Sequence, residues 1–106
     1  MSDNFKDRQK SFESKYAHDA ELQFKVEARR NRLLGEWAAD ILGKEGDEKA
    51  AYAKEVVKSD FEEAGDDDVF RKVEGDLGEK VPAAEIRAKM DALMQTAKEQ
   101  VMKEVG

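Results

Sequence analysis

Three aromatic residues near the N-terminus have the spacing of an amphipathic helix that binds another protein. Phe5 and Phe12 are seven residues apart, and Tyr16 follows four residues later, so all three fall on one side of a helix. Such a stripe is typical of a helix that inserts apolar anchors into a groove of its partner. The alternative is that the segment folds back and completes the core of its own protein. The surrounding residues are charged: Lys6, Asp7, Arg8, Lys10, Glu13 and Lys15.

A second candidate site is the basic run that ends at Arg32. Lys25, Arg29 and Arg32 are separated by four and three residues, which places them on one helical face. This face could bind a phosphate group or an acidic partner. A solvated face is the simpler interpretation, because Glu21 precedes Lys25 by four residues and can pair with it.

Catalytic and metal-binding patterns are not evident. An EF-hand counted from Asp66 needs glycine at its sixth position and glutamate at its twelfth, where this chain has Arg71 and Leu77. The single histidine, His18, has no Ser or Cys partner arrangement, and there is no glycine-rich phosphate loop. We therefore expect a protein that is not an enzyme and has no metal or other cofactor.

The composition predicts a small, charged, helical domain. The chain has 106 residues, of which 42% are charged and 40% hydrophobic, with one proline and no cysteine. This balance is typical of charged helices around a modest core. The net charge of −6 argues against nucleic-acid binding, which needs a basic face. Since no signal peptide and no bilayer-spanning apolar run are evident, we expect a cytoplasmic monomer without direct membrane insertion.

Apolar periodicity predicts four helices, over residues 20–42, 47–63, 67–77 and 83–103, with Trp37 and Phe61 buried. Their short connections indicate an all-α fold, a small antiparallel four-helix bundle over residues 19–106. A single helix over residues 4–43 would be about 60 Å long, too long for a domain of this size to cover. Because residues 1–18 contain few apolar side chains, we expect them to form a mobile or projecting helical arm outside the core.

Two blocks of the sequence are specific enough to indicate a family: FESKYAHD at residues 12–19 and ARRNRLLGEWA at residues 28–38. The segments over 52–73 and 86–91 extend the similarity to almost the whole chain. Together they resemble the zeta subunit family of alpha-proteobacterial rotary ATP synthases.

The resemblance implies a non-catalytic inhibitor that folds as a four-helix bundle. In this family the N-terminal segment inserts between catalytic and non-catalytic subunits of the ATPase head and blocks rotation in the hydrolysis direction. The implied location is the cytoplasm, peripheral to the inner membrane through the ATP synthase. Carried onto this chain, the inhibitory segment is about residues 2–17, with partner contacts expected from Asn4, Phe5, Lys6, Arg8, Gln9, Phe12, Glu13, Lys15 and Tyr16.

Two alternatives stay open beside the inhibitor. Similar bundles have been linked to nucleotide binding, with a weak nucleotide or phosphate contact possible at Lys25, Arg29 and Arg32. One alternative is therefore a small nucleotide sensor built around Arg29, Arg30 and Arg32. A general helical adaptor, which docks a partner through its bundle face, is the other alternative.

Overall fold

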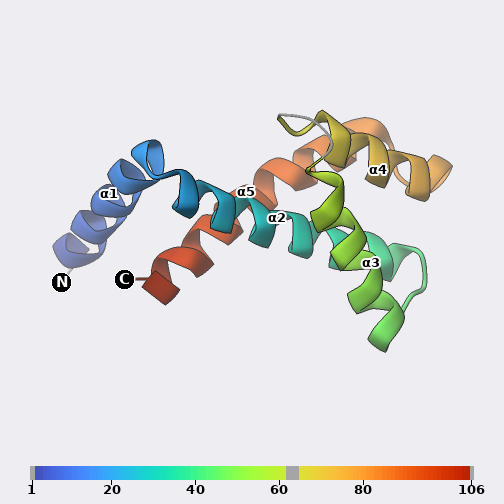
Figure 1. The fold of residues 1–106 in the computed structure, drawn as a ribbon, viewed down its shortest axis with the longest axis horizontal. Helices are drawn as coiled ribbons and strands as arrows, with labels where there is room; N and C mark the ends of the chain where they lie inside the picture. The colour runs from blue at the N-terminus through green and yellow to red at the C-terminus, as the bar shows by residue number, and fades with distance from the viewer. Residues whose placement is uncertain (1, 62–64, 106) are drawn as a thin grey trace.

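The computed structural model describes the backbone over residues 2–61 and 65–105, with side chains from Asp7 onward within these ranges. This described part is all-helical, in agreement with the predicted fold class (Figure 1). None of its helices is both long and apolar enough to cross a membrane. Its elements are α1 (Ser2–His18), α2 (Ala20–Ile41), α3 (Gly46–Ser59), α4 (Asp67–Leu77), the 3₁₀ turn η1 (Gly78–Lys80) and α5 (Ala83–Val105).

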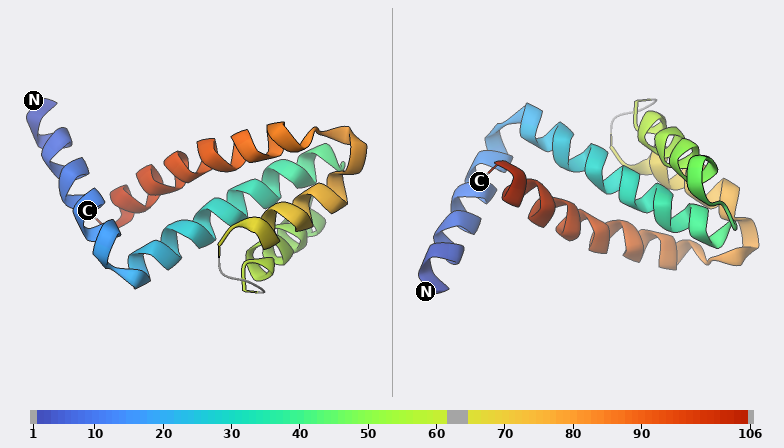
Figure 2. Two further views of the ribbon diagram at one scale, coloured as in Figure 1. Left: turned by 90° about the horizontal axis from the view of Figure 1, so that it is seen from above. Right: turned by 90° about the horizontal axis from the view of Figure 1, so that it is seen from below.

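Helix α2 is the central element, and it packs mainly against α3 and α5. Figure 2 shows α5 returning alongside α2 in the opposite direction, with α3 and α4 packed at the end of α2 that is remote from α1. The main core lies where α2, α3, α4 and α5 meet. Its buried apolar residues are Leu34, Ala38, Ala39, Tyr52, Val56, Val69, Val73, Leu77, Val81, Ile86 and Met90.

Glycines shape α2 at two positions. Gly43, just after the helix, has a φ of +78°, the left-handed conformation that is common for a glycine that ends a helix. Gly35 lies inside α2, where α3 approaches so closely that a Cβ atom at this position would be 2.7 Å from the Cα atom of Ala53. The missing side chain therefore sets the distance between α2 and α3.

Two predictions of burial are wrong. Trp37 is only partly buried and packs on the margin of the main core, with the Nζ atom of Lys89 5.8 Å from its ring centroid. The fully buried face of α2 is centred on Leu34 and Ala38, so Trp37 falls beside it. Phe61 is 66% exposed. Helix α3 ends at Ser59 rather than at residue 63, so Phe61 lies beyond the helix and is not on its buried face.

Candidate partner-binding site

The N-terminal helix is separated from α2 by a break at Asp19. Asp19 has an extended backbone and caps α2, since its carboxylate accepts hydrogen bonds from the backbone N–H groups of Glu21 (3.0 Å) and Leu22 (3.2 Å). The side-chain amide of Gln23 also donates to the backbone carbonyl of Tyr16 at 2.7 Å. These bonds fix a change of direction, so α1 and α2 are two helices and not one long rod.

The second half of α1 packs against α5, contrary to the expectation that the arm lies outside the core. Phe12 is only 6% exposed. The break at Asp19 turns α1 back, and α5 continues past the predicted end to Val105, which supplies a surface to receive it. Phe12 thereby joins a second apolar cluster with Leu22, Val26, Ala97, Val101 and Met102.

Tyr16 and Glu13 strengthen the same contact. The rings of Phe12 and Tyr16 stack with centroids 6.3 Å apart. The ammonium group of Lys98 lies 4.6 Å from the Tyr16 ring centroid and 3.8 Å from the Glu13 carboxylate. Burial raises the pKa of the Tyr16 hydroxyl, and the nearby Glu27 carboxylate raises it further. Three predicted contact residues thus face α5 in this structure.

The remaining predicted contact residues are exposed on α1 or have side chains that lie outside the described residues. Arg8, Gln9 and Lys15 are exposed. Arg8 and Lys15 border a hollow of about 110 Å³ beside Met102 of α5. The side chains of Asn4, Phe5 and Lys6 lie outside the described residues, although their backbone is helical. Figure 2 shows this N-terminal half of α1 extending away from the other helices.

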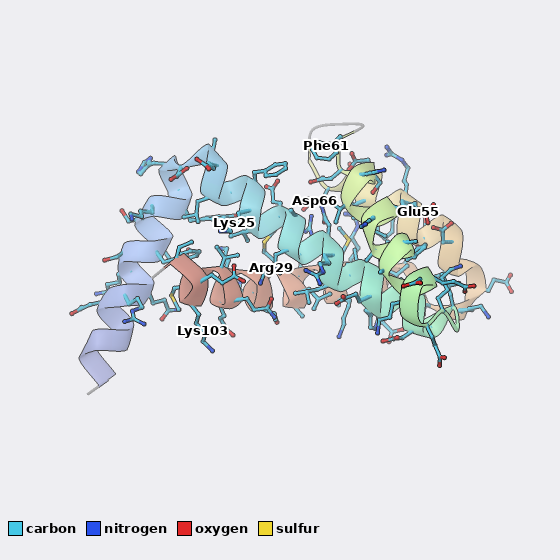
Figure 3. All side chains as sticks on the ribbon, turned by 60° about the horizontal axis from the view of Figure 1, so that its bottom comes forward. Lys25, Arg29, Glu55, Phe61, Asp66 and Lys103 are labelled. Atoms are coloured by element: carbon cyan, nitrogen blue, oxygen red, sulfur yellow. The ribbon has the colours of Figure 1, made fainter. Side chains whose placement is uncertain are left out.

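The basic triplet predicted on α2 is brought together. Lys25, Arg29 and Arg32 line one hollow of about 530 Å³ between α2 and α3. Arg29, however, donates to the Gln100 side chain at 2.9 Å and pairs with the Glu104 carboxylate, so it ties α2 to α5. Lys25 and Arg29 can be followed along α2 in Figure 3.

A buried arginine is the feature that sequence reasoning missed. Arg30 is 2% exposed, and it donates to the side-chain oxygen Oδ1 of Asn31 at 2.7 Å and to the Asp66 carboxylate at 2.8 Å. It was hidden in a run of basic residues that resembled a solvated face. The available signal was its spacing, since Arg30 lies four residues after Val26 and four before Leu34, on the buried face of α2.

The pKa values of the carboxyl groups around Arg30 are shifted in opposite directions. The hydrogen bond from Arg30 lowers the pKa of Asp66. Burial is the main cause that raises the pKa of both Glu27 and Asp60. Repulsion by Asp60 and Asp66 raises the pKa of Glu27 further, and repulsion by Asp68 and Asp66 raises that of Asp60. The described residues contain no group of three or more His, Cys, Asp or Glu side chains arranged to hold a metal ion. The ion pair between Arg30 and Asp66 joins α2 to the start of α4.

We expect Asp66→Asn to lower the free energy of unfolding by about 1–3 kcal/mol at pH 7, because it leaves the buried Arg30 without its anionic partner. The lowered pKa of Asp66 means that the pair stabilises the protein above the ordinary carboxyl pKa of about 4 and that this stability is lost as the pH falls through the folded-state pKa. Urea unfolding of both proteins at several pH values should show the difference shrinking toward acid pH.

Asp67→Asn is the matched control, since Asp67 pairs with Arg87 at an exposed site. Its cost should stay below about 1 kcal/mol. If Asp66→Asn costs no more than this control, the Arg30–Asp66 pair does not stabilise the fold.

Comparison with known proteins agrees with the predicted family. The family model described as ATPase inhibitor subunit zeta matches residues 1–100. No curated protein matches the chain. A protein whose structure was determined by solution NMR is 64% identical and superimposes with a TM-score of 0.74, over 78% of this chain and 98% of that one. Because the family model matches nearly the whole sequence, the chain belongs to the ATPase inhibitor subunit zeta family, and it is a regulatory protein rather than an enzyme.

Proposed function

We propose that this protein inhibits ATP hydrolysis by a rotary ATP synthase and that residues 1–18 are its inhibitory element. The family match supports inhibition of the synthase. The observation that carries the assignment to α1 is its separation from α2 at Asp19, with its first half extending away from the other helices (Figure 2). A helix that enters a cleft of a larger assembly must be able to move there without unfolding the rest of its own domain.

In this proposal α1 inserts between a catalytic and a non-catalytic subunit of the ATPase head and stops rotation in the hydrolysis direction. Residues 19–106 remain outside the cleft as the body that carries α1. The protein would then lie at the cytoplasmic side of the membrane, held there only through the synthase. The charged residues exposed on α1, such as Arg8 and Lys15, would contact the rim of the cleft, where charges contribute less than central anchors.

The contact between α1 and α5 implies a resting state. Phe12 and Tyr16 are the anchors expected to enter the partner, yet both face the second apolar cluster. To use them, α1 must first leave α5, and the apparent affinity for the synthase is reduced by the fraction of molecules in which α1 is docked. We propose that detachment of α1 precedes insertion.

The test is a titration of ATPase activity of the isolated synthase head with the whole chain and with a variant lacking residues 1–18. We expect the truncated variant to lose inhibition entirely. Phe5→Ala should weaken inhibition at least tenfold, the loss that corresponds to about 1.4 kcal/mol of binding free energy. Arg8→Ala should weaken it less, because an exposed charge is screened by solvent.

Amide exchange around Leu34 and Ala38 serves as the control for folding of the truncated variant. If that variant is folded and inhibits as well as the whole chain, α1 is not the inhibitor. The body would then act by docking on its partner, as a helical adaptor does.

A further inference from the structure

A groove runs between α2 and α3 on a part of the molecule to which α1 contributes no residue. Two hollows, of about 360 and 530 Å³, lie along these helices. Arg32 and Val57 border both hollows, so the two form one continuous depression, which we call the α2–α3 groove. The close approach of the helices at Gly35 and Ala53 holds its walls together.

The floor of the α2–α3 groove is apolar, and one end is marked by exposed aromatic rings. Ala28, Ala50 and Val57 line the floor. At the end near α1, Phe24 is 54% exposed, and its ring lies 5.9 Å from that of Phe61, which is 66% exposed. Phe61 is visible at the end of α3 in Figure 3. Exposed aromatic side chains beside a groove are typical anchors of a protein interface.

The rim of the α2–α3 groove is basic, whereas the whole chain carries a net charge of −6. Five cationic side chains border it, against only the two carboxylates of Glu21 and Glu36. The ammonium groups of Lys25, Lys54 and Lys58 are exposed and form no ion pair with any residue that the structure describes. An occupant with acidic side chains would therefore be attracted to this groove and oriented in it.

We propose that the α2–α3 groove binds an acidic amphipathic helix of a partner protein. Its walls are two helices and offer no strand edge, so an inserted helix is the mode of recognition that fits. Apolar side chains of that helix would cover the alanine floor and Phe24, and its acidic flanks would meet Lys25, Arg32 and Lys54. The α1 helix of a second copy is a poor occupant, because its four Lys and Arg side chains outnumber its three Asp and Glu side chains and it is therefore not acidic. This inference does not require the inhibitory role of α1.

The experiment uses isotope-labelled full-length protein and two synthetic helical peptides. Both carry leucine at the first, fourth, fifth and eighth positions of a repeated helical pattern, one flanked by glutamates and the other by lysines. We expect the acidic peptide to shift the amide resonances of Ala28, Arg32 and Val57 in a saturable way. The basic peptide should bind at least tenfold more weakly.

Charge reversal in the groove provides the second arm. The double variant Arg32→Glu with Lys54→Glu should weaken binding of the acidic peptide at least tenfold. Lys80→Glu with Lys103→Glu is the matched control, since it changes the net charge equally at exposed sites outside the groove. This control should change the affinity less than twofold, and thermal melts should show that both variants fold.

Three outcomes would overturn the proposal. Equal binding of both peptides would mean that the groove does not select acidic partners. If the two double variants weaken binding equally, the net charge of the protein explains the attraction and the groove residues do not. Shifts of the groove resonances by added ATP, without any by the acidic peptide, would make the groove a nucleotide site instead. None of these results depends on ATPase inhibition, which the truncation of α1 tests separately.

Discussion

Gly35→Ala is expected to lower the free energy of unfolding by about 1–3 kcal/mol, even though alanine favours helix over glycine. A Cβ atom at this position would lie 2.7 Å from the Cα of Ala53 and 3.3 Å from the Cβ of Val56. The nearer atom belongs to the backbone of α3, so it cannot rotate away as the end of a flexible side chain would. The helices must separate, and the main core between them loses contacts. Urea unfolding gives the change directly.

Gly75→Ala is the matched control for this substitution. Gly75 also lies inside a helix, α4, but a Cβ atom there would meet nothing within 4 Å. We expect this variant to be stabilised by about 0.5–1 kcal/mol, because alanine restricts the unfolded chain more than glycine does. Opposite signs for the two variants would show that the cost at residue 35 comes from helix packing. A gain in stability at both positions would mean that α2 and α3 are not in close contact.

Phe12→Ala is expected to detach α1 from α5 while the main core remains folded. Emptying a buried phenylalanine site costs about 3–5 kcal/mol, and few other apolar side chains of the described part of α1 help to hold it in place. Amide exchange over residues 7–18 should therefore accelerate at least a hundredfold, since about 1.4 kcal/mol corresponds to a factor of ten. Exchange at Leu34 and Ala38, in the main core, should change little.

Phe24→Ala is the control, because it removes the same ring from an exposed position on α2. It should leave exchange in α1 unchanged. If Phe12→Ala also leaves exchange unchanged, Phe12 is not what holds α1 to α5. If it accelerates exchange throughout the chain instead, the second apolar cluster is required for the whole fold and α1 cannot leave it as a separate unit.

Much of the fold was predictable because α2, α4 and α5 each combine a regular apolar stripe with a clear boundary. Their observed bounds differ by no more than two residues from the predicted ones. The start of α2 at residue 20 was predicted, but the change of direction at Asp19 was not, because no glycine or proline marks it. It is made by a side chain that caps the next helix, and Asp before Ala-Glu-Leu is a recognisable cap signal.

The position of Phe12 could not be predicted from its own segment. Phe12 becomes buried only because the chain turns at Asp19 and because the end of α5 lies where α1 returns. Arg30 shows the same limit, since the partner that allows its burial is Asp66, a residue 36 positions later at the start of α4. Local periodicity identifies faces, but it does not identify which distant element will cover each face. The family was recognisable because each of its two motif blocks is an uninterrupted stretch of the sequence.

The docking of α1 on α5 also bears on how long the free protein survives in the presence of proteases. Cleavage within a helix requires that the helix open, and its rate follows the population of the open form when closing is fast. The basic residues of α1, including Lys10 and Lys15, are potential cleavage sites for trypsin-like enzymes. Since Phe12 is buried in the second apolar cluster, the second half of α1 can open only when this contact breaks. The contact that must break before α1 can insert, in the function proposed above, thus also protects α1 from cleavage.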